Sequence, residues 1–306
     1  MGAILTLLSK VVVVSILIVV GYFLSKKGIL SNQGAADVTS ILVKVVTPCL
    51  IVDAFLKSKG SVELIEMAYA VGIGLLFSVI SIIVGGFGFK KEPESRKVVL
   101  RFAVTFGNVG FMGMPLVQGV VGEKGVVYAS FGIVIFNLIT WTYGYRMMNS
   151  SAKLTARTVI LNPGMIGLIV GFPLYLIAFN IPAVVSEPIG MMAALNTPLA
   201  MIIVGSYIAK LDIKDFISDK AIYVVAAKRL LLAPALFLVC MAIIRPQQDM
   251  LLSGTIQAAT PVAANCVLFS IQYKKDSLLA SKCLAVSTLL SIVTIPIFIV
   301  LAQLIH

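Results

Sequence analysis

Apolar residues come in long runs along the whole chain, and short polar connections separate them. A run of about 20 apolar residues crosses the hydrocarbon core of a bilayer as one helix. The pattern predicts an all-α polytopic membrane protein with ten spans: about 5–24, 38–56, 67–89, 98–120, 126–146, 158–179, 188–209, 221–244, 250–271 and 279–304. We expect the first run to be a retained span rather than a signal peptide, because Lys10 lies early in it and no small-residue cleavage site follows.

The fourth predicted span contains an unusual number of residues that interrupt helices. Gly107, Gly110 and Gly113 add backbone freedom, and Pro115 lacks an N–H group and clashes with the carbonyl four residues before it. In hydrocarbon, irregular backbone persists only where protein or a water-filled cavity satisfies its polar groups. The stretch 107–115 therefore predicts a broken helix beside a place that a polar ligand can visit. A simple kink is the alternative.

The chain divides into two halves of five predicted spans, 1–146 and 158–306, joined by a short linker at 147–157. An odd number of spans in each half makes the halves inverted relative to each other. The second span of each half contains a Thr-Pro pair, and the fourth span of each half is also interrupted by proline. Matched interrupted spans are the best sequence pointer to a transporter site. The predicted helix breaks are at Pro48, Pro115, Pro198 and Pro261.

Amide side chains flank the two prolines of the fourth spans, Pro115 and Pro261. If these prolines meet at one crossing, Asn108 and Asn265 lie on its cytoplasmic side, and Gln118 and Gln257 lie on its outer side. Amides toward each exit would give a polar ligand successive contacts during alternating access. The alternative is that buried amides only hold the spans together.

Ionisable residues inside a span are costly and therefore candidates for function. Asp53 is the only acid well inside a predicted span, and it is the candidate site for a coupling H⁺ or Na⁺. Because Lys44 is nine residues away, we expect the partner of Asp53 to come from another span. The alternatives are a structural ion pair and an interfacial position near the outer end of the span. One of Lys228 and Arg229 is expected to face the interior, where it would favour an anion or pair with Asp53.

The fifth predicted span carries a polar face with Asn137, Thr140 and Trp141 at helical spacing. Asn137 and Thr140 are deep enough to line a cavity. An aromatic belt at the membrane interface is the favoured explanation for Trp141.

Composition and charge support a membrane protein. The 306 residues are 59% hydrophobic and 12% charged, which excludes a soluble globular protein. Alternate connections hold 15 Lys and Arg residues, against four in the others. By the positive-inside rule the first set is cytoplasmic, which places both termini outside the cell membrane. The net charge of +11 therefore requires no nucleic acid.

The sequence contains no recognisable catalytic or metal-binding pattern. Four cysteines are scattered through apolar runs, and the single histidine is His306. These residues do not form a metal-ligand spacing, and neither a nucleophile motif nor a nucleotide loop is present. We expect no enzyme activity, no metal and no cofactor other than a coupling ion.

Several of these motifs together resemble the auxin efflux carrier family of membrane transporters. They are Asn108-x-Gly-x-x-Gly-x-Pro115, Thr47-Pro48, Asn162-Pro163 and the Arg-Leu-Leu-x-Ala-Pro run at 229–234. The resemblance implies an inverted five-plus-five repeat, similar to bile-acid/sodium symporters and sodium/proton antiporters, with crossing fourth and ninth helices. It also implies elevator-like transport of organic anions such as malate, malonate or auxin. Asn108 and the peptide groups around Pro115 and Pro261, including those of Gly110, Gly113 and Val262, would contact the substrate carboxylate.

The short linker resembles that of prokaryotic members rather than plant members. The predicted function is therefore a secondary transporter that moves a small organic anion through the lipid bilayer. The alternatives are a sodium-coupled symporter of the bile-acid type, a non-transporting membrane receptor or sensor, and a channel. A homodimer is a candidate assembly.

Overall fold

The computed structural model describes residues 2–57, 62–149, 163–177, 181–209 and 219–305, and these ranges are helical with short connections. The first half contains α1 (Gly2–Lys26), α2 (Asn32–Ile41), the π-helix η1 (Leu42–Val46), α3 (Thr47–Lys57), α4 (Leu64–Gly86), α5 (Glu94–Thr105), η2 (Val109–Gly113), α6 (Met114–Val120), α7 (Glu123–Ile139), η3 (Thr140–Gly144) and α8 (Tyr145–Met148). The second half contains α10 (Pro163–Leu176), α11 (Ala183–Ala194), α12 (Asn196–Ala209), α14 (Lys220–Ala227), η4 (Lys228–Leu232), α15 (Ala233–Ile244), α16 (Gln248–Ala258), α17 (Asn265–Gln272) and α18 (Ser277–Gln303).

Six helical stretches in the described ranges are long and apolar enough to cross a membrane. They are Asn32–Lys57, Leu64–Gly86, Lys124–Met148, Ala183–Ala209, Lys220–Ile244 and Ser277–Gln303. Shorter apolar helices cover Ser15–Lys26, Val109–Val120 and Met165–Leu176. Most of the predicted linker 147–157, from residue 150 on, and Asn162 of the Asn162-Pro163 motif lie outside the described residues.

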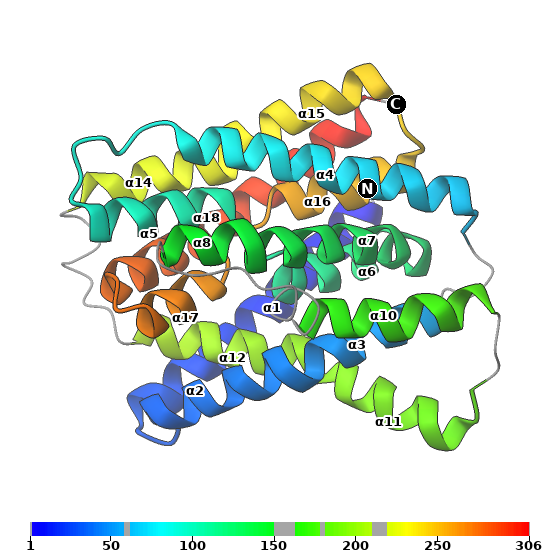
Figure 1. Ribbon diagram of the computed structural model, residues 1–306, viewed down its shortest axis with the longest axis horizontal. Helices are drawn as coiled ribbons and strands as arrows, with labels where there is room; N and C mark the ends of the chain where they lie inside the picture. Colours follow the sequence, from blue (N-terminus) through cyan, green and yellow to red (C-terminus); the bar gives the residue numbers. More distant parts are fainter. Residues whose placement is uncertain (1, 58–61, 150–162, 178–180, 210–218, 306) are drawn as a thin grey trace.

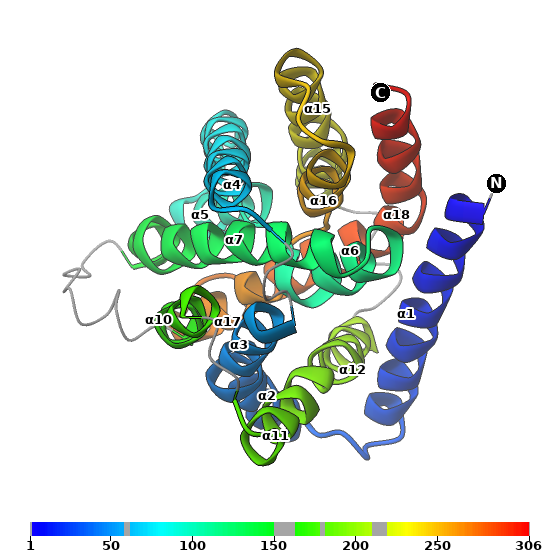
Figure 2. The same ribbon diagram turned by 90° about the vertical axis from the view of Figure 1, so that its right-hand side faces the viewer.

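The helices pack in two groups (Figures 1 and 2). The first group contains α1, α2, α3, α10, α11 and α12: α1 packs along α12, and α3 packs against α10 and α11. The second group contains α4 to α8 and α14 to α18, in which α4 and α16 pack against α7, and α5, α14, α16 and α17 pack against α18. Helices α6, α7, α18 and η2 of the second group contact the first group.

Glycine allows the closest helix contact in the first group. A Cβ atom on Gly21 of α1 would lie 2.0 Å from the Ile202 carbonyl oxygen of α12, and one on Gly205 would lie 1.9 Å from the Ile18 carbonyl oxygen. Any side chain at these positions would push the two backbones apart. Small residues at such contacts are typical of helices that associate in membranes.

Two interrupted helices cross in the second group. The chain is not helical at 106–108, between α5 and η2, or at 259–264, between α16 and α17. These segments pair in antiparallel fashion at Gly107 and Val262. Asn108 N donates to the Pro261 carbonyl at 2.8 Å, and Ala263 N donates to the Phe106 carbonyl at 2.9 Å. The crossing thereby satisfies backbone groups that neither half-helix can satisfy alone.

The position of this crossing corrects one sequence expectation. Gly107 and Val262 meet, whereas Pro115 lies in the first turn of α6, beyond η2. In η2 the amide of Met114 donates to Val109, five residues back, which widens the helix just before the proline. The wider turn relieves the clash that a proline ring makes in a regular helix. The break therefore falls at 106–108 and not at Pro115.

The other predicted proline breaks also behave differently from one another. Pro48 does not break its helix, because η1 ends two residues before it and the helix continues from Asn32 to Lys57. Pro198 follows an irregular residue, Leu195, that separates α11 from α12. Pro261 lies inside the non-helical segment itself. Of the four prolines, therefore, only Pro261 marks the broken segment directly.

Arg96 connects three polar ends of helices in the second group. Its guanidinium pairs with Asp219 at 2.5 Å, with Glu92 at 3.0 Å and with Asp276 at 3.5 Å. Asp219 and Asp276 are the N-caps of α14 and α18, where they accept hydrogen bonds from Ala221 N and Leu279 N. Burial alone would raise the pKa of Asp219, but the hydrogen bonds from Arg96 and the Ala221 amide outweigh it and lower that pKa.

We expect Arg96→Gln to lower the free energy of unfolding by about 1 kcal/mol at neutral pH, since a network of partly exposed pairs stabilises slightly more than one pair. A lowered carboxyl pKa stabilises the fold above the ordinary Asp pKa, and that stabilisation disappears as the pH falls through the lowered value. The difference between the variant and the parent should therefore shrink in acid. Unfolding in detergent at several pH values measures this. Lys97→Gln, which removes only the Glu94 pair, is the control, and an equal loss there would contradict the role of Arg96.

Candidate anion site at the helix crossing

Beyond the crossing, η2 and α17 begin beside a small cavity of about 50 Å³. The first N–H groups of a helix have no carbonyl partner in a preceding turn, and they carry the positive end of the helix dipole. The cavity is lined by Val43, Thr47, Gly107, Asn108, Val109, Gly110, Phe111, Ile133, Phe136, Asn137, Trp141, Pro163, Ala263, Ala264 and Asn265. The site thus combines two helix N-termini with amide side chains and an apolar wall.

Three asparagines supply the amide groups of this cavity. Asn108 is 3% exposed and immediately precedes η2, while Asn265 is half-buried and begins α17. Asn137 of α7 is 8% exposed, and its Nδ2 atom is buried without a hydrogen-bond partner. An unpaired buried donor is costly, so an acceptor in the cavity would be favoured. A carboxylate provides such acceptors.

Arg229 lies directly behind the wall of the small cavity. It is completely buried, and its guanidinium donates to the carbonyls of Thr260 at 2.9 Å and Ala258 at 3.1 Å. It also lies 3.3 Å from Thr260 Oγ1, 3.4 Å from Ser81 Oγ and 5.2 Å from the centre of the Phe77 ring. These carbonyls belong to the C-terminal end of α16, where a cation is favourable.

Gly107 separates this guanidinium from the cavity. A Cβ atom on Gly107 would lie 2.1 Å from Arg229 Nη2 and 2.6 Å from Thr260 Oγ1. Glycine is therefore required at this position for the crossing backbone to lie against the arginine. Arg229 does not line the small cavity, and Gly107 lies between its positive charge and the cavity.

Lys228 and Arg229 point to different surroundings. Lys228 donates to the carbonyls of Val84 and Phe87 at the end of α4, and its ammonium lies over the Phe89 ring. The expectation that one of the two cations faces the interior is therefore confirmed for Arg229. Its expected pairing with Asp53 is wrong, because its hydrogen bonds go to carbonyl and hydroxyl groups.

Asp53 has a partner on its own helix, which corrects a second expectation. Lys57 Nζ lies 2.8 Å from Asp53 Oδ2, one turn further along α3. The sequence prediction ended this span at residue 56 and placed Lys57 in a loop. The helix continues through Lys57, which creates the i,i+4 geometry of an ion pair.

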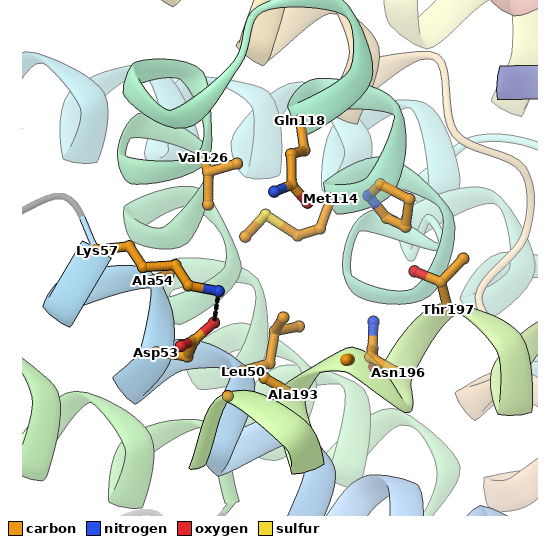
Figure 3. A pocket seen from close by; sticks show the side chains of 13 residues that line it. Leu50, Asp53, Ala54, Lys57, Met114, Gln118, Val126, Ala193, Asn196 and Thr197 are labelled. Carbon is orange, nitrogen blue, oxygen red and sulfur yellow. Dashed lines mark hydrogen bonds and ion pairs between the residues drawn. The ribbon is translucent and has the colours of Figure 1, made fainter. Parts of the chain in front are cut away.

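The Asp53–Lys57 pair lines a second, larger cavity of about 260 Å³ (Figure 3). Its other lining residues come from α3, α6, α7, α11 and α12: Leu50, Ala54, Met114, Pro115, Gln118, Val126, Gly190, Ala193, Ala194, Asn196 and Thr197. Helix α3 and the segment η2–α6 each pass from the small cavity to the large one. The two cavities therefore follow one another along the same two helical segments.

The predicted substrate-contacting residues separate into three sets. Asn108, Gly110, Asn137 and Asn265 line the small cavity, and Pro115 and Gln118 line the large one. Gly113, Pro261, Val262 and Gln257 line neither. Gln257 Nε2 donates to the Ala129 carbonyl at 2.8 Å, so this amide connects α16 to α7, as the alternative reading of the buried amides expected.

Four other residues lie at the two cavities although the sequence did not assign them there. Thr47 and Trp141 line the small cavity, and the Trp141 ring packs edge-to-face on the Phe269 ring. Asn196 and Thr197 line the large cavity. The signal for Thr47, Asn196 and Thr197 was their position next to the matched Thr-Pro pairs, which the sequence interpretation used only to locate helix breaks.

The described residues show no group of three or more His, Cys, Asp or Glu side chains that could hold a metal ion. All four cysteines are free. The small cavity offers amide groups and two helix N-termini, with the buried Arg229 behind Gly107, and such groups suit reversible binding of an anion.

Comparison with known proteins agrees with this description. The chain is 24% identical to an uncharacterized transporter of Methanothermobacter thermautotrophicus over 97% of its own length and 98% of that protein. It is 26% identical to an uncharacterized transporter of Methanocaldococcus jannaschii over 64% of the chain and 67% of that protein. It is 23% identical to a Rhizobium meliloti protein named "Putative malonate transporter" over 73% of each chain.

A family model described as membrane transport protein matches residues 6–159 and 151–299, which together cover nearly all of the sequence. These matches agree with the apolar helices and with the crossing between α5–α6 and α16–α17. The chain belongs to the membrane transport protein family, the auxin efflux carrier family.

Proposed function

We propose that the protein is a secondary transporter of a small carboxylate, bound in the cavity between the N-termini of η2 and α17. The observation that carries this proposal is the buried, unpaired Asn137 Nδ2 in a cavity that Asn108 and Asn265 also line. Helix N-termini favour negative charge, and amide N–H groups donate to carboxylate oxygens. Arg229 behind Gly107 adds a fixed positive charge.

The size of the small cavity supports a compact head group. About 50 Å³ holds a few water molecules, and a carboxylate group is of similar size. The Rhizobium meliloti relative carries the name of a malonate transporter. Malonate, a three-carbon dicarboxylate, is therefore the first substrate to test, followed by malate and an auxin-like acid.

We further propose that the ten predicted spans form an inverted five-plus-five repeat and that transport proceeds by alternating access. The two cavities that follow one another along α3 and η2–α6 support this proposal, since each offers polar groups to an anion, the small one at the crossing and the large one next to it. An elevator-like movement of the second helix group against the first would expose the small cavity to either face. We propose that the small cavity lies on the cytoplasmic side of the large one, which is the orientation that the distribution of Lys and Arg predicts.

A counterflow assay in proteoliposomes tests the function. Internal unlabelled malonate should drive transient accumulation of external labelled malonate, because alternating access couples the two fluxes. Downhill flux without exchange would favour a channel, and exchange that requires Na⁺ would favour a symporter of the bile-acid type. A thermal-shift screen of carboxylates is the companion measurement, since a specific ligand raises the apparent stability. Stabilisation without any flux would favour a receptor.

We propose Asp53 as the coupling site for H⁺ or Na⁺, because it is a carboxylate at the large cavity with only 13% of its side chain exposed. Asp53→Asn should abolish the dependence of malonate uptake on pH or Na⁺ while malonate exchange persists. Uptake measured across a range of pH and Na⁺ concentrations checks this. Lys57→Gln is the matched control, since it removes the ion pair but keeps the carboxylate. An unchanged ion dependence in Asp53→Asn would reduce Asp53 to a structural role.

The proposed orientation has its own test at Lys124, near the start of α7, where it pairs with Glu66 at 3.3 Å. A cysteine introduced at Lys124 should react with a membrane-impermeant thiol reagent added outside the cell, because the charge asymmetry places this end of α7 outside. Labelling of intact cells, compared with labelling of inverted vesicles, measures the orientation. Reaction only from the cytoplasmic face would reverse it.

A further inference from the structure

Asn196 joins the two helix groups at the place where the two cavities approach each other. It is 2% exposed and begins α12 in the first group, directly after the irregular residue Leu195. Its Nδ2 atom donates to the Gly110 carbonyl of η2, in the second group, at 3.3 Å. Asn196 lines the large cavity, and Gly110 lines the small one. One hydrogen bond thus connects the walls of both cavities.

We propose that Asn196 is a gate residue, whose hydrogen bond to Gly110 closes the passage between the small and the large cavity in this conformation. The inference rests on the proposed transport by alternating access. A movement of the second group against the first must break this bond, because its donor and acceptor belong to different groups. The residues that wall the two cavities are close along the chain here: Phe111 lines the small cavity and Met114 the large one.

The other end of the same amide supports a switching role. Asn196 Oδ1 is buried and has no hydrogen-bond partner in the described part of the chain. A buried polar atom without a partner raises the free energy of the conformation that contains it. Movement of Gly110 away from α12 would open Asn196 to water or to a ligand, and both amide atoms could then be satisfied. The closed conformation therefore keeps one hydrogen bond and one unsatisfied acceptor.

The chemistry of the freed amide fits the proposed substrate. Once Gly110 has moved, Asn196 Nδ2 becomes an available donor at the boundary of the large cavity. A carboxylate that leaves the small cavity could accept from it before it reaches Gln118 and Lys57. The gate residue would therefore also be a transient contact of the anion.

Cysteine accessibility tests the gate without any substrate. The reporter is Val43→Cys, which places a thiol in the wall of the small cavity, in a protein whose four native cysteines are replaced by alanine. In the parent, an impermeant thiol reagent should label this cysteine from one membrane face. With Asn196→Ala, labelling from the opposite face should accelerate about five- to tenfold, the factor that one net hydrogen bond provides. Asn196→Asp, whose carboxylate repels the Gly110 carbonyl, should accelerate it at least as much.

Thr197→Val is the matched control, because Thr197 lines the same large cavity one residue away, and labelling should stay as in the parent. Unchanged labelling from the second face in both Asn196 variants would overturn the gate, and so would equal acceleration in Thr197→Val. Malonate counterflow by the parent, measured separately, distinguishes the two proposals. Exchange without a labelling change contradicts only the gate, whereas a labelling change without exchange contradicts only the proposed substrate.

Discussion

Arg229→Met should destabilise the protein by about 3–5 kcal/mol, the largest loss that we expect from any single substitution. The change removes the donors to the Ala258 and Thr260 carbonyls, both fully buried, and methionine offers no replacement. Each buried acceptor left without a partner costs about 1–3 kcal/mol. Thermal and denaturant unfolding in detergent measure the loss. A variant as stable as the parent would contradict the view that Arg229 holds the crossing together.

Two comparisons separate the parts of this effect. Lys228→Met, at the neighbouring residue, should lower the free energy of unfolding by no more than about 1 kcal/mol, because Lys228 contacts the end of α4 and is half-buried.

Arg229→Lys retains the charge but cannot replace the forked donors, so stability should fall while anion binding persists. Two unit charges about 8 Å apart interact by about 2 kcal/mol at an effective dielectric constant of about 20. Equal malonate affinity in Arg229→Lys and Arg229→Met would exclude an electrostatic role.

Asn108→Ala should weaken malonate binding by about 10- to 100-fold and leave the protein folded. The substitution removes an amide that lines the small cavity, and a hydrogen bond to a charged group contributes about 1.5–3 kcal/mol. The backbone pairing of residue 108 with Pro261 needs no side chain, so the crossing should persist. Ligand-induced thermal shift and counterflow measure the loss.

Asn108→Asp gives a second test, because the aspartate side chain has the same shape as that of asparagine. A carboxylate at this position would repel an anionic substrate, so binding should fall further than in Asn108→Ala. Asn149→Ala is the control, because Asn149 ends α8 and lines neither cavity. Parent affinity in both Asn108 variants would remove Asn108 from the proposed site, and the anion would have to bind elsewhere.

The structure also shows why sequence reasoning reached Asn108 but misplaced its neighbours. Glycines and Asn108 mark an interruption because their effect on a helix is local, and the break at 106–108 lies at the start of the stretch 107–115. The sequence predicts the crossing at Pro115, because proline is the strongest helix breaker. The π-helix η2 accommodates Pro115, which has no N–H group. A π-helical turn depends on packing that a sequence pattern does not reveal.

The partners of the charged residues were the least predictable part of the site. The sequence predicts a partner for Asp53 from another span, because Lys44 is nine residues away and the predicted span ends before Lys57. One additional helical residue, Lys57, lies one turn after Asp53 on α3 and brings the pair together at 2.8 Å. A pairing of Arg229 with Asp53 is one of the two sequence expectations, yet the guanidinium donates to the carbonyls at the end of α16. Such carbonyls exist at every helix end, so sequence alone could not indicate which end would receive the arginine.

The order of residues along the chain suffices to predict the helical membrane class, the two interrupted regions and the polar character of the stretch that contains Asn108. These properties follow from hydrophobicity and from the backbone preferences of glycine and proline, which act over one helix. Helix packing, in contrast, brings Gly107 to Val262, places Arg229 behind Gly107 and brings Asn196 to Gly110. Each of these contacts joins residues far apart in the sequence, and their register depends on how whole helices pack against each other.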